Sequence, residues 1–311
     1  MESLPTSPDR PASEWGATRR HAAGPGHRWT RGGAGTHGNG CCWWREQWRL
    51  PRSSSLAWYA SGDAKRRDPS APTASSTRTT TDRSTAVRNP QPLLHAWQLD
   101  DREYRRQEER RGRRFAYTSF DPTRTALVVV DMVPFFVDAN PYARGIVPNI
   151  QHLADRLHDA GGTVAWILPA RTERTPVGDE FHGPEAAEMF RNSGGTGPLP
   201  GRLWHGFTLG ADDMLVEKSA PSAFFPGRCP LPERLQERGI DTVLITGTVT
   251  NVCCESSARD ACTLGYRVIM IADANATGRD CDHNATLRTV YRSFGDVRPT
   301  ADVLAMITGQ D

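Results

Sequence analysis

Lysine is almost absent from this chain. Of its 38 basic side chains only two, Lys65 and Lys218, are lysines. Where nearly every basic position is arginine, a remaining lysine suggests a position that a guanidinium cannot fill, because an ammonium is compact and changes its pKa readily when buried. Lys218 follows the short apolar run 214–216. It is therefore a candidate site residue, and a chance surface lysine is the alternative.

The first 90 residues lack the side chains that build a core. They contain no isoleucine and one valine, Val87, yet they hold six of the nine tryptophans and 14 basic against 7 acidic residues. Such a segment cannot bury enough apolar surface to offset the entropy of ordering it. We predict that residues 1–93 are a disordered extension, or that natural translation starts after them. An arm for single-stranded nucleic acid is the alternative.

The remainder of the chain lacks a basic excess, long apolar runs and patterned cysteines. Residues 91–311 carry 24 basic and 29 acidic side chains, which argues against nucleic acid as a partner. No secretory segment or run of membrane-spanning length is present, so we expect no membrane partner and a cytoplasmic location. The seven cysteines show neither zinc spacing nor a disulfide pattern. The expectation is a reduced protein without a metal or cofactor.

Alternating apolar runs and helical periods indicate an α/β domain over residues 120–311, preceded by a densely charged arm or helix at 94–119. Strands are predicted at 125–131, 163–168, 214–217, 242–246 and 267–272, helices at 146–160, 230–238, 251–264 and 280–294, and a last element at 303–307. This order predicts a Rossmann-like three-layer α/β/α fold with a mostly parallel sheet of about six strands. In such sheets the ligand crevice lies beyond the carboxyl ends of the strands.

Three chemically distinctive features occupy strand carboxyl ends. Asp131 ends the first apolar run, Lys218 follows the third, and the segment 247–254 follows the fourth. Because these ends meet at one edge of a parallel sheet, we expect the three features to converge there.

The segment 247–254 reads as a strand-to-helix turn that carries a nucleophile. Thr250 is a natural N-cap, which would place Cys253 in the first helical turn, where the helix dipole lowers a thiol pKa. An ammonium at Lys218 would add to that effect, and Asp131 could accept the thiol proton. Free N–H groups of Cys253 and of Val249 or Thr250 could form an oxyanion hole.

These motifs resemble the isochorismatase-like cysteine hydrolases over roughly residues 120–308. Asp131 follows Val-Val-Val, Lys218 stands in Glu-Lys-Ser-Ala-Pro-Ser-Ala-Phe, and Cys253 stands in Gly-Thr-Val-Thr-Asn-Val-Cys-Cys. The resemblance implies a Rossmann-like fold, an Asp–Lys–Cys catalytic triad and a homodimer or homotetramer. It also implies a cis peptide bond at Val249–Thr250 that shapes the oxyanion hole.

The reaction implied by the resemblance is hydrolysis of a carbon–nitrogen bond through a thioester, in a small amide, ureide, N-carbamoyl compound or lactam. Two differences from known members of the family narrow the range of implied reactions. Isochorismatases that cleave a vinyl ether lack the cysteine, so Cys253 argues against that activity. Nicotinamidases carry an Asp and His metal cluster after the second strand, where this chain reads Ile-Leu-Pro-Ala-Arg-Thr-Glu over 167–173. A vinyl-ether hydrolase and a non-catalytic binding or scaffold protein remain the alternatives.

Four further side chains are candidate substrate contacts. Arg171 could bind a substrate carboxylate or carbonyl, or form a salt bridge with Glu173 or a neighbour. The aromatic residues Phe136, Trp204 and Phe224 could form pocket walls or simply pack in the core. His283 has no motif partner and is expected at the surface.

Overall fold

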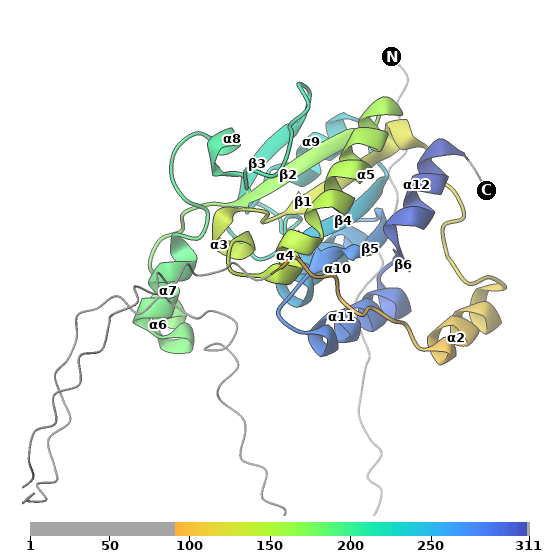
Figure 1. Ribbon diagram of the computed structural model, residues 1–311, viewed down its shortest axis with the longest axis horizontal. Coiled ribbons are helices and arrows are strands. Elements are labelled where there is room, and N and C mark those ends of the chain that lie inside the picture. Colours follow the sequence, from red (N-terminus) through yellow and green to blue (C-terminus); the bar gives the residue numbers. More distant parts are fainter. Residues whose placement is uncertain (1–90, 310–311) are drawn as a thin grey trace, which may run out of the picture. The chain divides into compact units, whose positions relative to one another are not determined.

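The computed structural model describes residues 91–309, so most of the predicted N-terminal extension lies outside the described residues. Six parallel strands form one sheet in the order β3-β2-β1-β4-β5-β6. They are β1 (Thr125–Val130), β2 (Thr163–Pro169), β3 (Met214–Lys218), β4 (Thr242–Thr248), β5 (Arg267–Ala276) and β6 (Asp296–Arg298) (Figure 1). The predicted α/β fold with a parallel sheet is confirmed.

Helices occupy the connections between the strands. In the described part these are α2 (Asp101–Arg111), η1 (Pro122–Arg124), α3 (Pro134–Val137), α4 (Pro141–Gly145), α5 (Val147–Asp159), α6 (Pro176–His182), α7 (Pro184–Arg191), α8 (Leu199–Arg202), α9 (Leu231–Glu237), η2 (Thr250–Cys254), α10 (Glu255–Thr263), α11 (Asp280–Ser293) and α12 (Thr300–Thr308). The Gly- and Pro-rich excursion between β2 and β3 thus contains three short helices, α6 to α8.

The two faces of the sheet build two separate cores. Alternate residues of a strand point to opposite faces, and β1 is buried along its whole length. Val128 packs with side chains of α9, α10 and α11, whereas Leu127 and Val129 pack with those of α5 and α12. A continuous apolar run is what a strand covered on both sides requires. The sheet is therefore the middle of three layers.

The sixth strand is a segment that the sequence does not indicate, and the last predicted element is a helix. Residues 303–307 belong to α12, and β6 is the three-residue segment Asp296–Arg298. Its Asp296 is fully buried and accepts backbone hydrogen bonds from Ala116 and Tyr117, both at 2.8 Å. A strand of three residues with a charged residue at each end is too short to show the alternation of apolar and polar residues that predicts a strand.

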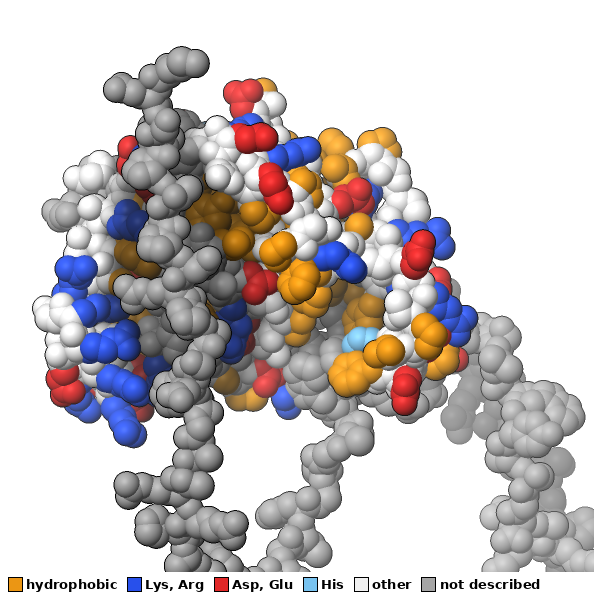
Figure 2. Space-filling model, turned by 180° about the vertical axis from the view of Figure 1, so that it is seen from behind, with side chains coloured by type: hydrophobic (Ala, Val, Ile, Leu, Met, Phe, Trp, Pro, Cys, Tyr) orange, Lys and Arg blue, Asp and Glu red, His pale blue; other side chains and the backbone are white. Residues whose placement is uncertain are grey.

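The charged arm forms α2 and packs on α11. Asp100 caps its start and Gly112, with φ of 73°, ends it. Glu103 and Gln107 are buried, and Glu103 pairs with Arg292 of α11. The arginines on the other side of α2 are exposed, and blue side chains gather at the lower left of Figure 2, the side on which α2 lies.

Candidate active site

The candidate site lies where the order of the strands reverses. β1 and β4 are neighbours in the middle of the sheet, although two other strands separate them in the sequence. Such a switch point opens a crevice at the carboxyl ends of the strands. Asp131 follows β1 and the turn η2 with Cys253 follows β4, while Lys218 ends β3.

Asp131 has an unusual backbone. Its φ is 53°, and among the described residues it is the one non-glycine residue with a positive φ. Its N–H donates to the Ile167 carbonyl at 2.8 Å, and its own carbonyl accepts the Thr248 hydroxyl at 2.9 Å. Backbone conformations of this kind persist where the surroundings hold them, and they concentrate at functional sites. The carboxylate is thereby aimed across the carboxyl edge of the sheet.

The three motif side chains meet in the structure. Lys218 Nζ lies 2.8 Å from Asp131 Oδ2 and 3.5 Å from Cys253 Sγ, and it also donates to the Ala220 carbonyl at 3.1 Å. Asp131 is 1% exposed, Lys218 5% and Cys253 9%. The other carboxylate oxygen, Asp131 Oδ1, has no hydrogen-bond partner among the described residues. It is therefore available to accept a proton.

Burial and charge oppose each other in this cluster. Burial raises the pKa of Asp131, and the Lys218 ammonium works against that rise. Burial alone would lower the pKa of Lys218, but the neighbouring Asp131 and Cys253 raise it above its ordinary value. Lys218 therefore remains a cation at neutral pH, and removal of either member would leave a buried charge without its partner.

The expected lowering of the Cys253 pKa is wrong for the resting site. Burial raises the pKa of this thiol to about 12; Lys218 opposes the rise and the Asp131 carboxylate adds to it. The ammonium therefore does not produce a thiolate here, because burial outweighs its effect and the Asp131 carboxylate adds to the rise. The thiol needs a base to become a nucleophile, and Asp131 is in place to be that base.

The turn that carries Cys253 differs in detail from the prediction. Residues Thr250–Cys254 form one π-helical turn that continues into α10, so Cys253 does lie in the first turn. The N-cap, however, is Val249, and the Thr250 hydroxyl bonds His283 Nδ1 at 3.0 Å instead of capping the helix. The cis peptide bond is Thr248–Val249, one residue before the expected position.

Gly247 allows β4 to reach this turn. Its φ is 110°, and a Cβ there would stand 2.1 Å from the Val130 carbonyl oxygen. The register of β4 against β5 also shifts between Ile245 and Gly247. Only glycine combines this conformation with such a close approach to β1, and the approach places the ends of the two strands side by side.

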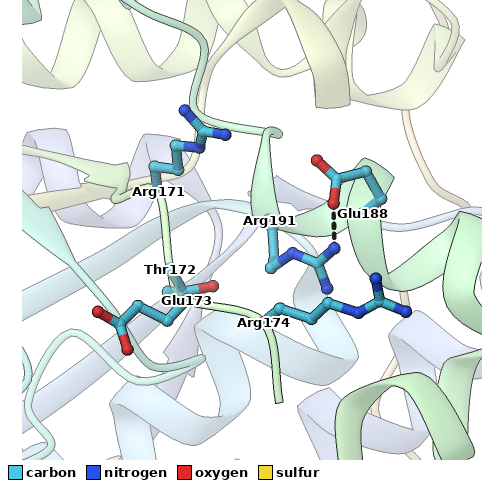
Figure 3. A pocket seen from close by; sticks show the side chains of 6 residues that line it. All are labelled: Arg171, Thr172, Glu173, Arg174, Glu188 and Arg191. Atoms are coloured by element: carbon cyan, nitrogen blue, oxygen red, sulfur yellow. Dashed lines mark hydrogen bonds and ion pairs between the residues drawn. The ribbon is translucent and has the colours of Figure 1, made fainter. Parts of the chain in front are cut away.

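Arg171 follows β2 and lines an open cavity of about 420 Å³ that includes none of the three motif side chains (Figure 3). Ala170, its neighbour, donates its N–H to the Lys218 carbonyl at 2.8 Å, which ties this segment to the end of β3. The other lining residues are Thr172, Glu173, Arg174, Glu188 and Arg191. Arg174 pairs with Asp179 and Arg191 with Glu188, while Arg171 forms no ion pair with a described residue. Arg171 therefore makes no ion pair with Glu173, but its charge acts on the neighbouring Glu188, whose pKa is lowered mainly by Arg191 and further by Arg171.

The three aromatic candidates have different surroundings. Trp204 is partly exposed. Its backbone N–H donates to the Met132 carbonyl at 2.9 Å and its indole N–H donates to Asp138 at 2.8 Å, so Trp204 covers the loop after β1. Phe136 is 8% exposed and packs with the α5 side of the core. Phe224 has no exposed surface and packs in the other core, edge-on to Tyr266. The structure gives Phe224 a packing contact rather than a place on a pocket wall.

Two histidines to which the sequence assigns no site role lie near Thr250–Cys254, which we call the nucleophile turn. His283, expected at the surface, is fully buried, and His95 is 6% exposed. The signal for His283 was present in the periodicity of its helix. His283, Leu287 and Val290 follow each other at spacings of four and three, which is one face of a helix, and all three are buried.

The described residues show no other chemical centre of note. No group of three His, Cys, Asp or Glu side chains among them is arranged to hold a metal ion. The five described cysteines are free thiols, and Cys41 and Cys42 lie outside the described part. No helix within residues 91–309 has the length and apolarity to cross a membrane.

Comparisons with known proteins agree with this geometry. Residues 125–302 match the model of the isochorismatase domain. The chain is 33% identical over 193 residues to the uncharacterized isochorismatase family protein YwoC of Bacillus subtilis, covering 61% of this chain and 97% of that protein. It is 42% identical over 172 residues to nicotinamidase 3 of Arabidopsis thaliana, covering 54% and 81%. The fold also resembles a cysteine hydrolase from Pseudomonas syringae with a TM-score of 0.52 and 26% identity, covering 63% of this chain and 98% of that one.

Proposed function

The chain belongs to the isochorismatase family, and on that premise we propose that it hydrolyses a carbon–nitrogen amide bond in a small molecule with Cys253 as the nucleophile. One observation carries the proposal. A buried ammonium, Lys218 Nζ, lies within 2.8 Å of a carboxylate and 3.5 Å of a thiol, and that carboxylate keeps one oxygen without a partner. This arrangement supplies a nucleophile, a base and a fixed positive charge.

Acylation begins with transfer of the thiol proton to Asp131. As Oδ1 takes the proton, Cys253 Sγ attacks the carbonyl carbon and the π electrons move to the carbonyl oxygen. The resulting oxyanion is held by backbone N–H groups of the turn, for which Val249, Thr250 and Cys253 are the candidates. Lys218 stabilises negative charge on sulfur and on the carboxylate throughout, and its own proton is not consumed.

Collapse of the tetrahedral intermediate breaks the carbon–nitrogen bond. The proton held by Asp131 passes to the departing nitrogen, so that ammonia or an amine leaves and a thioester on Cys253 remains. Asp131 then takes a proton from a water molecule, whose oxygen attacks the thioester carbon. Collapse of this second tetrahedral intermediate breaks the carbon–sulfur bond, the proton on Asp131 returns to Cys253 Sγ, and the acid product departs. Each step uses the same proton acceptor, which is consistent with a single carboxylate in the cluster.

The surroundings favour a substrate that carries an anionic group. Arg171 makes no ion pair as close as those of Arg174 and Arg191, although its charge acts on Glu188, and it stands at the same sheet edge as Lys218. A guanidinium in that position suits a carboxylate or a polarised carbonyl oxygen. Phe136 and Trp204 are the proposed apolar contacts. The similarity to nicotinamidase 3 supports an amide rather than an ether as the scissile bond. A homodimer or homotetramer remains a prediction.

A substrate panel tests this function. We expect the purified full-length chain to release ammonia or amine from at least one amide, ureide, N-carbamoyl compound or lactam. Each compound is tested in two forms, one that carries a carboxylate group and one that does not. Because Arg171 would bind the carboxylate, we expect kcat/KM to be at least about tenfold higher for the form that carries it. Turnover of a vinyl ether alone, or of no compound in the panel, would contradict the proposal.

A further inference from the structure

A segment that precedes the family domain crosses behind the nucleophile turn. We call residues 91–99 the strap. Leu93 donates its N–H to the Pro141 carbonyl at 3.0 Å, and a Cβ on Gly145 would stand 1.8 Å from the Leu93 carbonyl oxygen, so the strap lies directly on α4. Farther along, the Gln98 N–H donates to Asn284 Oδ1 at 2.9 Å and fixes the strap to α11.

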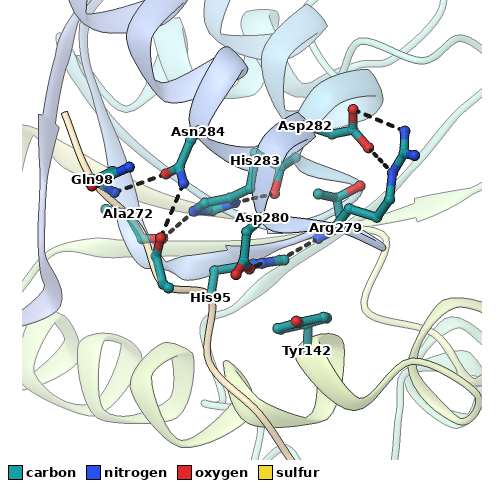
Figure 4. Close-up of polar contacts among 12 residues, drawn as sticks. His95, Gln98, Tyr142, Ala272, Arg279, Asp280, Asp282, His283 and Asn284 are labelled. Atoms are coloured by element: carbon teal, nitrogen blue, oxygen red, sulfur yellow. Dashed lines mark hydrogen bonds and ion pairs between the residues drawn. The ribbon is translucent and has the colours of Figure 1, made fainter. Parts of the chain in front are cut away.

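The strap inserts one ring, His95, between two aromatic side chains of the domain. The His95 and Tyr142 ring centroids lie 4.0 Å apart with an interplanar angle of 6°, and the His95 and His283 centroids lie 4.2 Å apart with an angle of 15° (Figure 4). Three parallel rings from the strap, α4 and α11 therefore form one stack. Close packing of this kind transmits a displacement of one ring to the next.

Hydrogen bonds fix the tautomers of both histidines. A backbone N–H can only donate and a carbonyl can only accept. His95 Nε2 accepts from the Thr277 N–H at 3.1 Å, so its proton is on Nδ1, which donates to Asp280 at 2.6 Å. His283 Nε2 donates to the Ala272 carbonyl at 3.0 Å, so its Nδ1 accepts the Thr250 hydroxyl. Burial lowers the pKa of His95, and it lowers that of His283 to about 3, so both rings are neutral.

Two routes lead from His95 to the start of the nucleophile turn. Through the ring stack His95 contacts His283, whose Nδ1 accepts a hydrogen bond from the Thr250 hydroxyl at 3.0 Å. Through its hydrogen bond it holds Thr277, whose hydroxyl donates to Asn251 Oδ1 at 2.7 Å. Thr250 and Asn251 are the first two residues of η2, and Cys253 follows two positions later.

We propose that His283 and His95 are positioning residues for the reaction, and that the strap holds the backbone of the nucleophile turn in its productive geometry. The expected change in kcat rests on the proposed function, whereas the hydrogen bonds and ring stack that hold the turn do not depend on it. Neither histidine contacts Asp131, Lys218 or Cys253 through a described hydrogen bond, so both act through Thr250 and Asn251. Displacements of about 1 Å in such a turn can cost a factor on the order of 100 in rate.

Point variants of the full-length chain test the strap. We expect His95→Ala to lower kcat about tenfold with KM changed less than threefold, because the loss is in alignment rather than binding. His95→Phe retains the ring stack and should recover part of the loss. Gln107→Ala is the matched control: Gln107 bonds the Tyr291 and Arg292 carbonyls and docks α2 on the same helix, away from the stack. It should lower the melting temperature and keep kcat within twofold of wild type.

Nitrogen-15 NMR of the histidine rings separates failure of this inference from failure of the proposed function. The wild-type spectrum should show His95 as the Nδ1–H tautomer and His283 as the Nε2–H tautomer, and His95→Ala should shift the His283 signals. If no substrate is found, the function fails, and these spectra alone still decide the inference. Unchanged His283 signals in His95→Ala, wild-type kcat in that variant, or an equal loss in Gln107→Ala would each overturn it.

Discussion

Cys253→Ala is expected to lower kcat by about 10⁴-fold or more, because the proposed reaction then lacks the nucleophile that attacks the carbonyl carbon. The substitution removes only a sulfur from a buried position, so the fold should survive it. Turnover measured on the best substrate of the panel checks the prediction. A variant with kcat near that of the wild type would mean that bond cleavage proceeds without the thiol, as in a vinyl-ether hydrolase.

The adjacent residue offers a matched control. Cys254 has no exposed surface, and its sulfur faces the Thr246 carbonyl at 3.9 Å, inside the core rather than toward Lys218. Burial raises the pKa of Cys254 well above its ordinary value. Cys254→Ala should therefore keep kcat within about threefold and lose stability by about 1 kcal/mol, the typical result of removing a small buried group. A greater loss of activity from Cys254→Ala than from Cys253→Ala would exchange the two roles.

Lys218→Arg is the second substitution with a large expected effect, a loss of about 10³-fold in kcat. The ammonium lies within 3.5 Å of three acceptors, and the side chain is 4% exposed. A planar guanidinium is larger and directs its donors in a fixed fork, so it cannot reach Asp131 and Cys253 in the same way. The loss should appear in kcat, with a smaller change in KM.

The chain contains its own control for that exchange. Lys65, the other lysine, lies in the part of the chain that the structure does not describe, and Lys65→Arg should retain wild-type kcat. Melting temperatures of both variants show whether the buried position still folds. A folded Lys218→Arg enzyme with a rate near that of the wild type would remove the assigned role, since charge alone would then suffice.

Much of the fold was predictable because its strands are continuous apolar runs. β1 and β2 are buried on both faces, and a continuous apolar run is the sequence pattern that predicts such burial. Asp131, Lys218 and Cys253 could be brought together from sequence because each follows a strand in a parallel sheet. The rarity of lysine in this chain made Lys218 conspicuous. Local pattern and topology therefore located the cluster without coordinates.

What the sequence could not supply depends on distant partners. Thr250 has the local signature of an N-cap, but His283, 33 positions away, takes its hydroxyl. The helix N-terminus predicts a lowered pKa for Cys253, but burial by the surrounding core outweighs that effect. His95 lies in a segment without regular structure, and only the fold shows that its ring is stacked on α11. In each case a rule based on neighbouring residues failed because contacts with distant parts of the chain outweighed it.

The most direct test of the central claim is intact-protein mass spectrometry of enzyme quenched within its first turnover. We expect an added mass equal to the acyl part of the substrate, mapped by peptide digestion to Cys253 and absent from Cys253→Ala. An acyl group on any other residue, or unmodified enzyme at every time point of a productive turnover, would contradict it.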